Sequence, residues 1–250
     1  MILRRVFGSG NLEAVSTDDI DAGVRVAGWY EHPLPRWLRL NLIASVDGTA
    51  AGADGTSETL TNRADRLILG VLRRQADVVL VGAASVRAEG YRLPKTAKLA
   101  ILTASGNLTG HRVSSEGDPV PGRLLVLCPQ SAVATATATL GEIAAEIIVI
   151  PDDAGRLNVA SVVDFLHGRG LAKIICEGGP SLAAQLLSAN VVDELCLSTS
   201  PRITGNALSL LGANSPTDRR LTLLQLLVDD ASGIYARWSV DRSELGLSAS

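Results

Sequence analysis

Residues 171–201, LAKIICEGGPSLAAQLLSANVVDELCLSTSP, carry the pattern from which the fold class is predicted. An apolar run of strand length stops at two glycines, and Pro180 follows at a first helical position, where proline is favoured. The stretch predicts three elements: a strand over 171–179, a helix over 180–190 and a strand over 192–201. Because a helix between two consecutive strands favours a parallel crossover, this stretch indicates an α/β sheet.

The same alternation continues upstream. Short apolar runs, bounded by glycine or polar residues, predict strands that are buried on both faces, at 37–44, 76–82, 99–106, 123–129 and 147–151. Between them, helical patterns cover 62–75 (with Thr61 as the expected N-cap), 83–90, 131–146 and 158–170, and a loop is expected over 107–122. At the end of the chain, runs at 219–228 and 233–240 flank a tight turn. The predicted class is therefore α/β, with a mostly parallel central sheet, flanking helices and a C-terminal antiparallel hairpin.

Composition fits a single globular domain. The chain has 250 residues, of which 46% are hydrophobic and 20% charged, which excludes wholesale disorder. The N-terminal segment is polar and carries prolines, so we expect an irregular arm over 1–35 and one domain over 36–250. A net charge of −3 and a low aromatic content of 3% argue against a nucleic-acid partner.

The sequence favours a reducing, cytoplasmic location. No apolar run reaches the length of a membrane span, and the N-terminus lacks the apolar core of a signal peptide. The three cysteines, Cys128, Cys176 and Cys196, are widely spaced and lie in apolar runs. We therefore expect buried thiols rather than disulfides or a metal site.

Two glycine-containing strand ends are candidates for ligand binding, because ligands of open α/β sheets bind at the carboxyl ends of strands. Glu177 to Ser181 (EGGPS) runs into a helix start, which suits a phosphate group. Gly82 to Ser85 (GAAS) repeats the pattern one crossover earlier. Each motif alone is more often a simple turn, but together they suggest a dinucleotide.

A third strand end carries a carboxylate. Ser45-Val46-Asp47-Gly48 places Asp47 where it would orient a substrate or take part in proton transfer. The alternative is an ordinary Asp-Gly turn. The chain has neither a nucleophile elbow nor a zinc-deaminase signature.

In combination, these motifs resemble a known family. Asn41 followed by the Ser45 to Gly48 motif, then ADVVLVGAASVRAE (76–89), then CEGGPSLAAQLLSANVVDELCLSTSPRITG (176–205), is similar to the reductase domain of bacterial riboflavin biosynthesis. That domain is related in fold to dihydrofolate reductase, and the similarity covers about residues 36–240. The resemblance implies NADPH as hydride donor, a phosphoribosylamino-pyrimidine reduced at ribose C1′ to a ribitylamine, and a homodimer.

The resemblance also implies roles for individual residues. Two cofactor phosphate loops would consist of Gly82, Ala83 and Ser85, and of Gly178, Gly179 and Ser181. The adenosine ribose and 2′-phosphate would lie against Thr103 and Ser105. The nicotinamide and substrate pocket would include Asn41, Ser45, Asp47 and Glu177, with Asp47 and Glu177 as the candidate catalytic residues. The substrate ribose and phosphate would be reached by Thr61 and Arg66.

The sequence departs from the family at two places. Thr49 stands where a lysine is usual, and residues 89–95 replace the usual acidic and basic segment, with Arg92 or Lys95 as the available cations. Because the substrate half matches less well, two alternatives stay open. One is reduction of dihydrofolate or another pterin, and the other is an NADP-binding module without catalysis.

Overall fold

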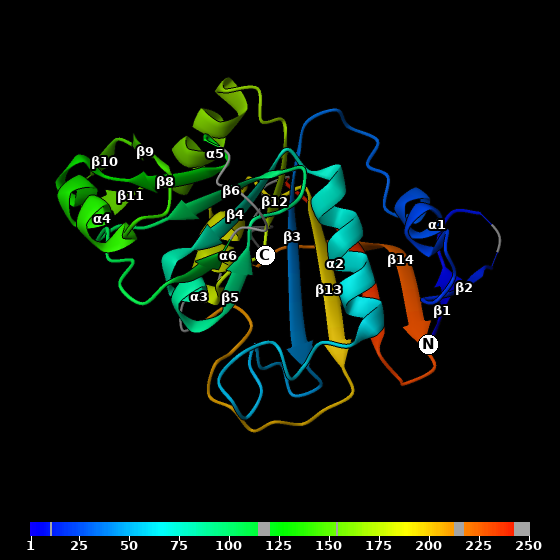
Figure 1. Ribbon diagram of the computed structural model, residues 1–250. Helices are drawn as coiled ribbons and strands as arrows, with labels where there is room; N and C mark the ends of the chain where they lie inside the picture. The colour runs from blue at the N-terminus through cyan, green and yellow to red at the C-terminus, as the bar shows by residue number, and fades with distance from the viewer. Residues whose placement is uncertain (11, 115–120, 154, 213–217, 243–250) are drawn as a thin grey trace, which may run out of the picture.

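The computed structural model describes residues 1–10, 12–114, 121–153, 155–212 and 218–242 (Figure 1). These residues form an eleven-stranded sheet in the order β2-β1-β14-β15-β13-β3-β12-β4-β6-β8-β9. Its strands are β1 (Ile2–Phe7), β2 (Ala14–Ser16), β3 (Trp37–Ser45), β4 (Val78–Gly82), β6 (Lys98–Leu102), β8 (Leu124–Cys128), β9 (Glu146–Val149), β12 (Lys173–Cys176), β13 (Glu194–Ser200), β14 (Leu221–Asp229) and β15 (Ile234–Val240).

The sheet has a parallel part and an antiparallel part. The seven strands from β13 to β9 in this order are parallel to their neighbours, and β15, β14, β1 and β2 continue the sheet in antiparallel pairing. The prediction of a mostly parallel sheet with a C-terminal antiparallel hairpin is confirmed, since β14 and β15 pair across the turn at residues 230–233.

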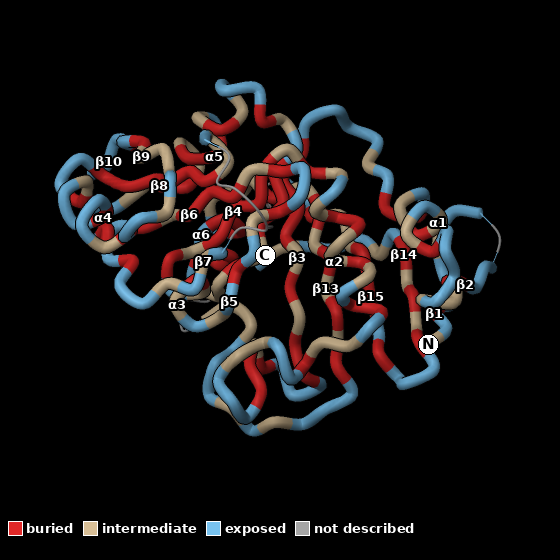
Figure 2. The backbone as a smooth tube through the Cα atoms, in the orientation of Figure 1, coloured by how far each residue is buried: buried red, intermediate tan, exposed pale blue. Residues whose placement is uncertain are grey.

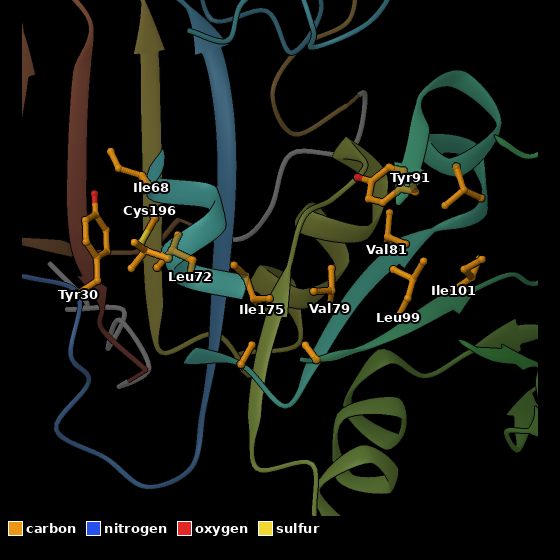
Figure 3. Packing of buried hydrophobic residues seen from close by; sticks show 14 of the residues in the cluster. Tyr30, Ile68, Leu72, Val79, Val81, Tyr91, Leu99, Ile101, Ile175 and Cys196 are labelled. Carbon is orange, nitrogen blue, oxygen red and sulfur yellow. The ribbon is translucent and has the colours of Figure 1, made fainter. Parts of the chain in front are cut away.

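Helices cover both faces of the parallel part. Buried residues of α1 (Ala22–Trp29), α2 (Arg63–Gln75), α3 (Ala83–Ala88) and α4 (Val133–Leu140) belong to one apolar cluster, and those of α5 (Val159–Gly168) and α6 (Pro180–Ser188) belong to a second. Val79 and Val81 of β4 point into the first cluster, and Val78 and Leu80 into the second. This two-sided burial explains why the strands, which are mostly red in Figure 2, read as continuous apolar runs. Figure 3 shows residues of the first cluster, among them Val79 and Val81 of β4.

The expectation of an irregular segment over 1–35 is wrong. β1 pairs with β14, β2 pairs with β1, and α1 packs against α2. Arg5 occupies a buried position of β1, where its guanidinium pairs with Glu13 and lies 5.3 Å from the ring centre of Trp29. A buried arginine at this position breaks the apolar alternation that normally indicates a strand.

Three smaller expectations also need correction. The N-cap of α2 is Asn62 and not Thr61, because the Asn62 side chain accepts a hydrogen bond from the Asp65 amide. α4 ends at Leu140, because Gly141 adopts a φ of +70°. The expected loop over 107–122 contains β7 (Arg112–Ser114), which pairs with β5 (Gly90–Arg92), and its residues 115–120 lie outside the described ranges. A further small hairpin joins β10 (Asp152–Asp153) to β11 (Arg156–Leu157).

Candidate active site

A cleft of about 1150 Å³ opens at the carboxyl ends of β3, β4, β6 and β12. It brings together predicted site residues from five separate parts of the chain. Those that line it are Asn41, Thr61, Arg66, Gly82, Ala83, Ser85, Thr103, Ser105, Glu177, Gly178, Gly179 and Ser181. Ser45 and Asp47 are not among the lining residues.

Two glycine loops meet in the middle of the cleft, because β4 and β12 are neighbours in the sheet. The amide of Gly82 donates to the Gly178 carbonyl over 2.8 Å. Gly178 has a φ of +86°, and the Gly178–Gly179 peptide is cis. A side chain at Gly179 would place its Cβ 2.8 Å from the Ser85 hydroxyl, so the two loops touch without room for side chains between them.

Helix α6 begins where the second glycine loop ends. Gly179 is its N-cap, and Pro180 occupies the first helical position, as expected. The amides of Ser181 and Leu182 in the first turn have no intrahelical acceptor, and the helix dipole adds positive potential there. The residues present therefore form a cradle for an anionic group, built from backbone rather than from a basic side chain.

A third loop, after β6, also lines the cleft. Thr103 is buried and its hydroxyl accepts the Gly106 amide over 3.0 Å, while the Ser105 hydroxyl accepts the Asn107 amide over 3.2 Å. Arg87 of α3 also lines the cleft and donates to the Asn107 carbonyl over 2.6 Å. This cation beside the loop was not predicted from the sequence.

Glu177 is held by an ion pair. Arg73, at the end of α2, donates from Nε and Nη2 to its two carboxylate oxygens over 2.7 and 2.6 Å. The guanidinium also lies 5.9 Å from the ring centre of buried Tyr91. Such a two-point contact fixes the carboxylate plane, so Glu177 enters the cleft in one orientation. Arg73 was missed because 104 residues separate the two partners.

Asp65 is a second carboxyl group in the cleft, and it was not predicted from the sequence either. It lies in the first turn of α2, is 9% exposed, and accepts the Thr61 hydroxyl over 2.6 Å. Burial raises the pKa of Asp65, and hydrogen bonds from Ser198 and Thr61 act in the opposite direction. An acidic residue in a first helical turn is common because it stabilises the helix, so Asp65 has no separate signal in the sequence.

The Asp47 side chain does not line the cleft but joins two loops that border it. Its carboxylate accepts the Ser45 hydroxyl over 2.5 Å and the amides of Thr204 and Gly205 over 3.3 and 2.9 Å. The hydrogen bond from Ser45 and then that from Gly205 lower the pKa of Asp47. The side chain thus fastens the loop after β13 to the end of β3, where the two loops run together in Figure 1.

Thr49 belongs to the same fastening. Its hydroxyl lies 2.6 Å from that of Ser45 and 2.5 Å from that of Thr204. At the position where the family usually has lysine, this chain therefore has a buried contact between loops.

Arg66 and Asn41 do line the cleft, and Arg66 pairs with Glu58 at its exposed edge.

No group of three or more metal-ligating side chains comes together within the described ranges. None of the described helices has the length and apolar character that a transmembrane span requires. The three cysteines are buried free thiols, as expected.

A family model, the RibD C-terminal domain, matches residues 36–233. The chain belongs to this family. The proposed resemblance is thereby confirmed, and the match leaves β1, β2 and α1 outside the family's domain.

Members of the RibD C-terminal domain family in several organisms are similar to the chain. A 2,5-diamino-6-ribosylamino-4(3H)-pyrimidinone 5′-phosphate reductase of Archaeoglobus fulgidus is 27% identical over 193 residues, which are 72% of this chain and 84% of the relative. The reductase of the same name from Methanothermobacter thermautotrophicus is 28% identical over 68% of this chain and 79% of its own length. The riboflavin biosynthesis protein RibD of Chlamydia pneumoniae is 24% identical over 70% of this chain. The matched region spans about half, 48%, of that relative.

Solved structures of the family show the same fold. A pyrimidine reductase-like protein from Corynebacterium diphtheriae superposes with a TM-score of 0.69 at 24% identity, covering 87% of this chain and 99% of that chain. A riboflavin biosynthesis reductase, Rib7 of Saccharomyces cerevisiae, superposes with a TM-score of 0.61 at 17% identity, over 86% of this chain and 94% of its own. The predicted fold is confirmed by these superpositions.

Proposed function

We propose that this protein is an NADPH-dependent reductase that transfers hydride to ribose C1′ of a phosphoribosylamino-pyrimidine, a step of riboflavin biosynthesis. One observation carries the proposal. In a chain that belongs to the RibD C-terminal domain family, a cleft contains both the two glycine loops, which can hold an anionic group, and the buried carboxyl groups of Glu177 and Asp65. The reaction breaks the C1′–O4′ bond, adds a hydride to C1′ and adds a proton to O4′.

The residues present fit a nicotinamide dinucleotide. Gly82, Gly178 and Gly179 let a phosphate approach the backbone, and a Cβ at Gly82 would lie 3.5 Å from the Gly179 nitrogen. We assign Gly82, Ala83 and Ser85, with Gly178, Gly179 and Ser181, to the pyrophosphate. We assign Thr103 and Ser105 to the adenosine ribose and its 2′-phosphate. When bound, the cofactor supplies the hydride.

The remaining lining residues would hold the substrate. In this proposal Asn41 and Thr61 contact its polar groups, and Arg66 at the cleft edge contacts its phosphate. Glu177, fixed by Arg73, orients the reacting end of the substrate, and a fixed orientation is worth several orders of magnitude in rate. Asp47 and Ser45 act indirectly, by fastening the loops after β3 and β13 that border the cleft.

We further propose that the protein works as a homodimer in the cytoplasm. The antiparallel end of the sheet exposes apolar side chains, among them Leu221, Leu224 and Ile234, which would suit an interface between copies. The buried free thiols suit a reducing compartment. Sedimentation of the purified protein measures the oligomeric state, and a monomer at all concentrations would refute the dimer.

The direct test of the activity is to incubate the purified protein with NADPH and the phosphoribosylamino-pyrimidine and to follow the absorbance of reduced nicotinamide. We expect oxidation that depends on the substrate and a ribityl product of matching amount. A Gly82→Val variant serves as the matched control, since it fills the cradle. Binding of NADPH without oxidation, with intact substrate, would instead identify a non-catalytic binding module.

A further inference from the structure

Asp65 has the properties of a ligand-binding carboxylate. It is 9% exposed, lines the cleft, and belongs to none of the ion pairs formed by the described residues. Its sequence neighbour Arg66 forms its ion pair with Glu58, and acts on Asp65 only through its charge, which opposes the upward shift of the Asp65 pKa. A buried carboxyl group without a cationic partner is costly, and such groups occur at functional sites more often than elsewhere.

The contacts of Asp65 leave it able to accept further hydrogen bonds. An ionised carboxylate has about four acceptor positions. The hydroxyl of Thr61 donates to Oδ2 over 2.6 Å, and Ser198 of β13 supplies a second hydrogen bond. Asp65 therefore retains acceptor positions for two donors of a ligand in the cleft.

The two substrates named among the relatives differ at one ring position that a carboxylate can distinguish. A 2,5-diamino-6-ribosylamino-4(3H)-pyrimidinone presents N3–H and a C2 amino group, which are two adjacent donors. The 5-amino-6-(5-phosphoribosylamino)uracil named for a Thermotoga maritima structure presents N3–H and a C2 carbonyl, which are a donor and an acceptor. A carboxylate pairs with the first edge at two points and repels the carbonyl oxygen of the second.

We propose that Asp65 is a specificity-determining residue that selects a 2-amino-4-oxopyrimidine ring over a uracil ring. The proposal rests on the reductase function proposed above and names the substrate class for that site. The upward shift of the Asp65 pKa is consistent with a site that is completed by the two ligand donors, which stabilise the ionised form. A reduced pterin carries the same amino and oxo edge, so the shared chemistry is the ring edge.

The test compares the diaminopyrimidinone ribose phosphate with its uracil counterpart, both as substrates and as ligands. Binding is measured by calorimetry in the presence of NADP⁺, where no turnover occurs. We expect wild-type protein to prefer the amino compound by about tenfold or more. In Asp65→Asn, the amide offers one acceptor and one donor, so we expect the preference to shift toward the uracil compound by at least about tenfold.

Controls separate this proposal from the proposed function. Asp164→Asn, an exposed change on α5, should keep the wild-type preference, and thermal unfolding checks that Asp65→Asn is folded. If both rings bind wild-type protein equally, or if Asp65→Asn lowers both affinities by the same factor, the proposal is wrong although the reductase function stands. If neither compound is reduced but the preference in binding persists, the reductase function fails and the role of Asp65 stands.

A third ligand distinguishes the source of the ring. Dihydrofolate carries the 2-amino-4-oxo edge without a ribose phosphate. Turnover of dihydrofolate with an efficiency similar to that of the diaminopyrimidinone would assign the site to pterins, and the same loss in Asp65→Asn would support the role of the carboxylate. Dihydrofolate binding that is unchanged in Asp65→Asn would contradict it.

Discussion

A single methyl group at Gly82 tests the location of the cofactor cradle. Gly82 has φ −78° and ψ 146°, which alanine adopts without strain. Its Cβ would lie 3.5 Å from the Gly179 nitrogen and 3.8 Å from the Gly178 carbonyl oxygen, both ordinary contacts. We therefore expect Gly82→Ala to change the free energy of unfolding by less than about 1 kcal/mol.

The same methyl group should weaken NADPH binding strongly. It would lie 3.5 Å from the Gly179 nitrogen, in the loop that we assign to the cofactor pyrophosphate, and would obstruct a phosphate oxygen that approaches this nitrogen. A hydrogen bond to a charged group contributes about 1.5–3 kcal/mol, so loss of one corresponds to a rise in Kd of roughly 10- to 150-fold.

Calorimetry with NADPH measures the Kd, and chemical unfolding measures stability. Gly168→Ala, near the end of α5, is the matched control, because its added Cβ would meet nothing within 4 Å. An unchanged Kd for Gly82→Ala, with an intact fold, would show that the phosphate lies elsewhere.

Three further outcomes follow from individual contacts. Glu177→Gln leaves the Arg73 guanidinium without its counter-charge, and the Arg73 side chain is only 23% exposed. We therefore expect the free energy of unfolding, measured in urea, to fall by about 2–4 kcal/mol. A fall of less than about 0.5 kcal/mol would argue against the pairing. Asp47→Ala should raise the KM for the pyrimidine severalfold while the Kd for NADPH stays constant, and equal effects on both would contradict an indirect role. Burial raises the pKa of Asp229, but hydrogen bonds from Tyr235, Gly233 and Asn62 lower it overall. The ionised Asp229 carboxylate therefore stabilises the fold fully above pH 3.8, and this contribution is lost as the pH falls from 3.8 through the lower pKa of the folded state. Asp229→Asn removes the contribution, so the free energy of unfolding of the variant should depend less on pH over this range.

Most of the sheet is predictable from sequence because its strands are buried on both faces. Runs such as VVLVG at 78–82 indicate a strand without knowledge of the neighbouring strands. The glycine at the end of the run indicates the edge of the sheet where a ligand binds. Nine of the predicted site residues come together for this reason, because they lie at or follow the carboxyl ends of β4, β6 and β12, which meet at one edge of the sheet. The other three that line the cleft are Asn41 within β3 and Thr61 and Arg66 at the start of α2.

The missed features depend on contacts between distant segments. β1 has a buried arginine that is stabilised by Glu13 and Trp29, so its own alternation is hidden. Arg39 is fully buried in an ion pair with Glu194, 155 residues away, and this pair was not predicted although its strand, β3, was. Asp47 has the sequence signature of a catalytic strand-end carboxylate, yet the loop after β13 uses its acceptor positions.

Hydride transfer to ribose C1′ is tested most directly with NADPH that carries deuterium at the transferable C4 position. After turnover with the phosphoribosylamino-pyrimidine, the ribityl product is examined by mass spectrometry and NMR. We predict one deuterium per molecule, located at C1′. A product without deuterium at C1′, or NADPH that stays reduced in the presence of intact substrate, would contradict hydride transfer to this carbon.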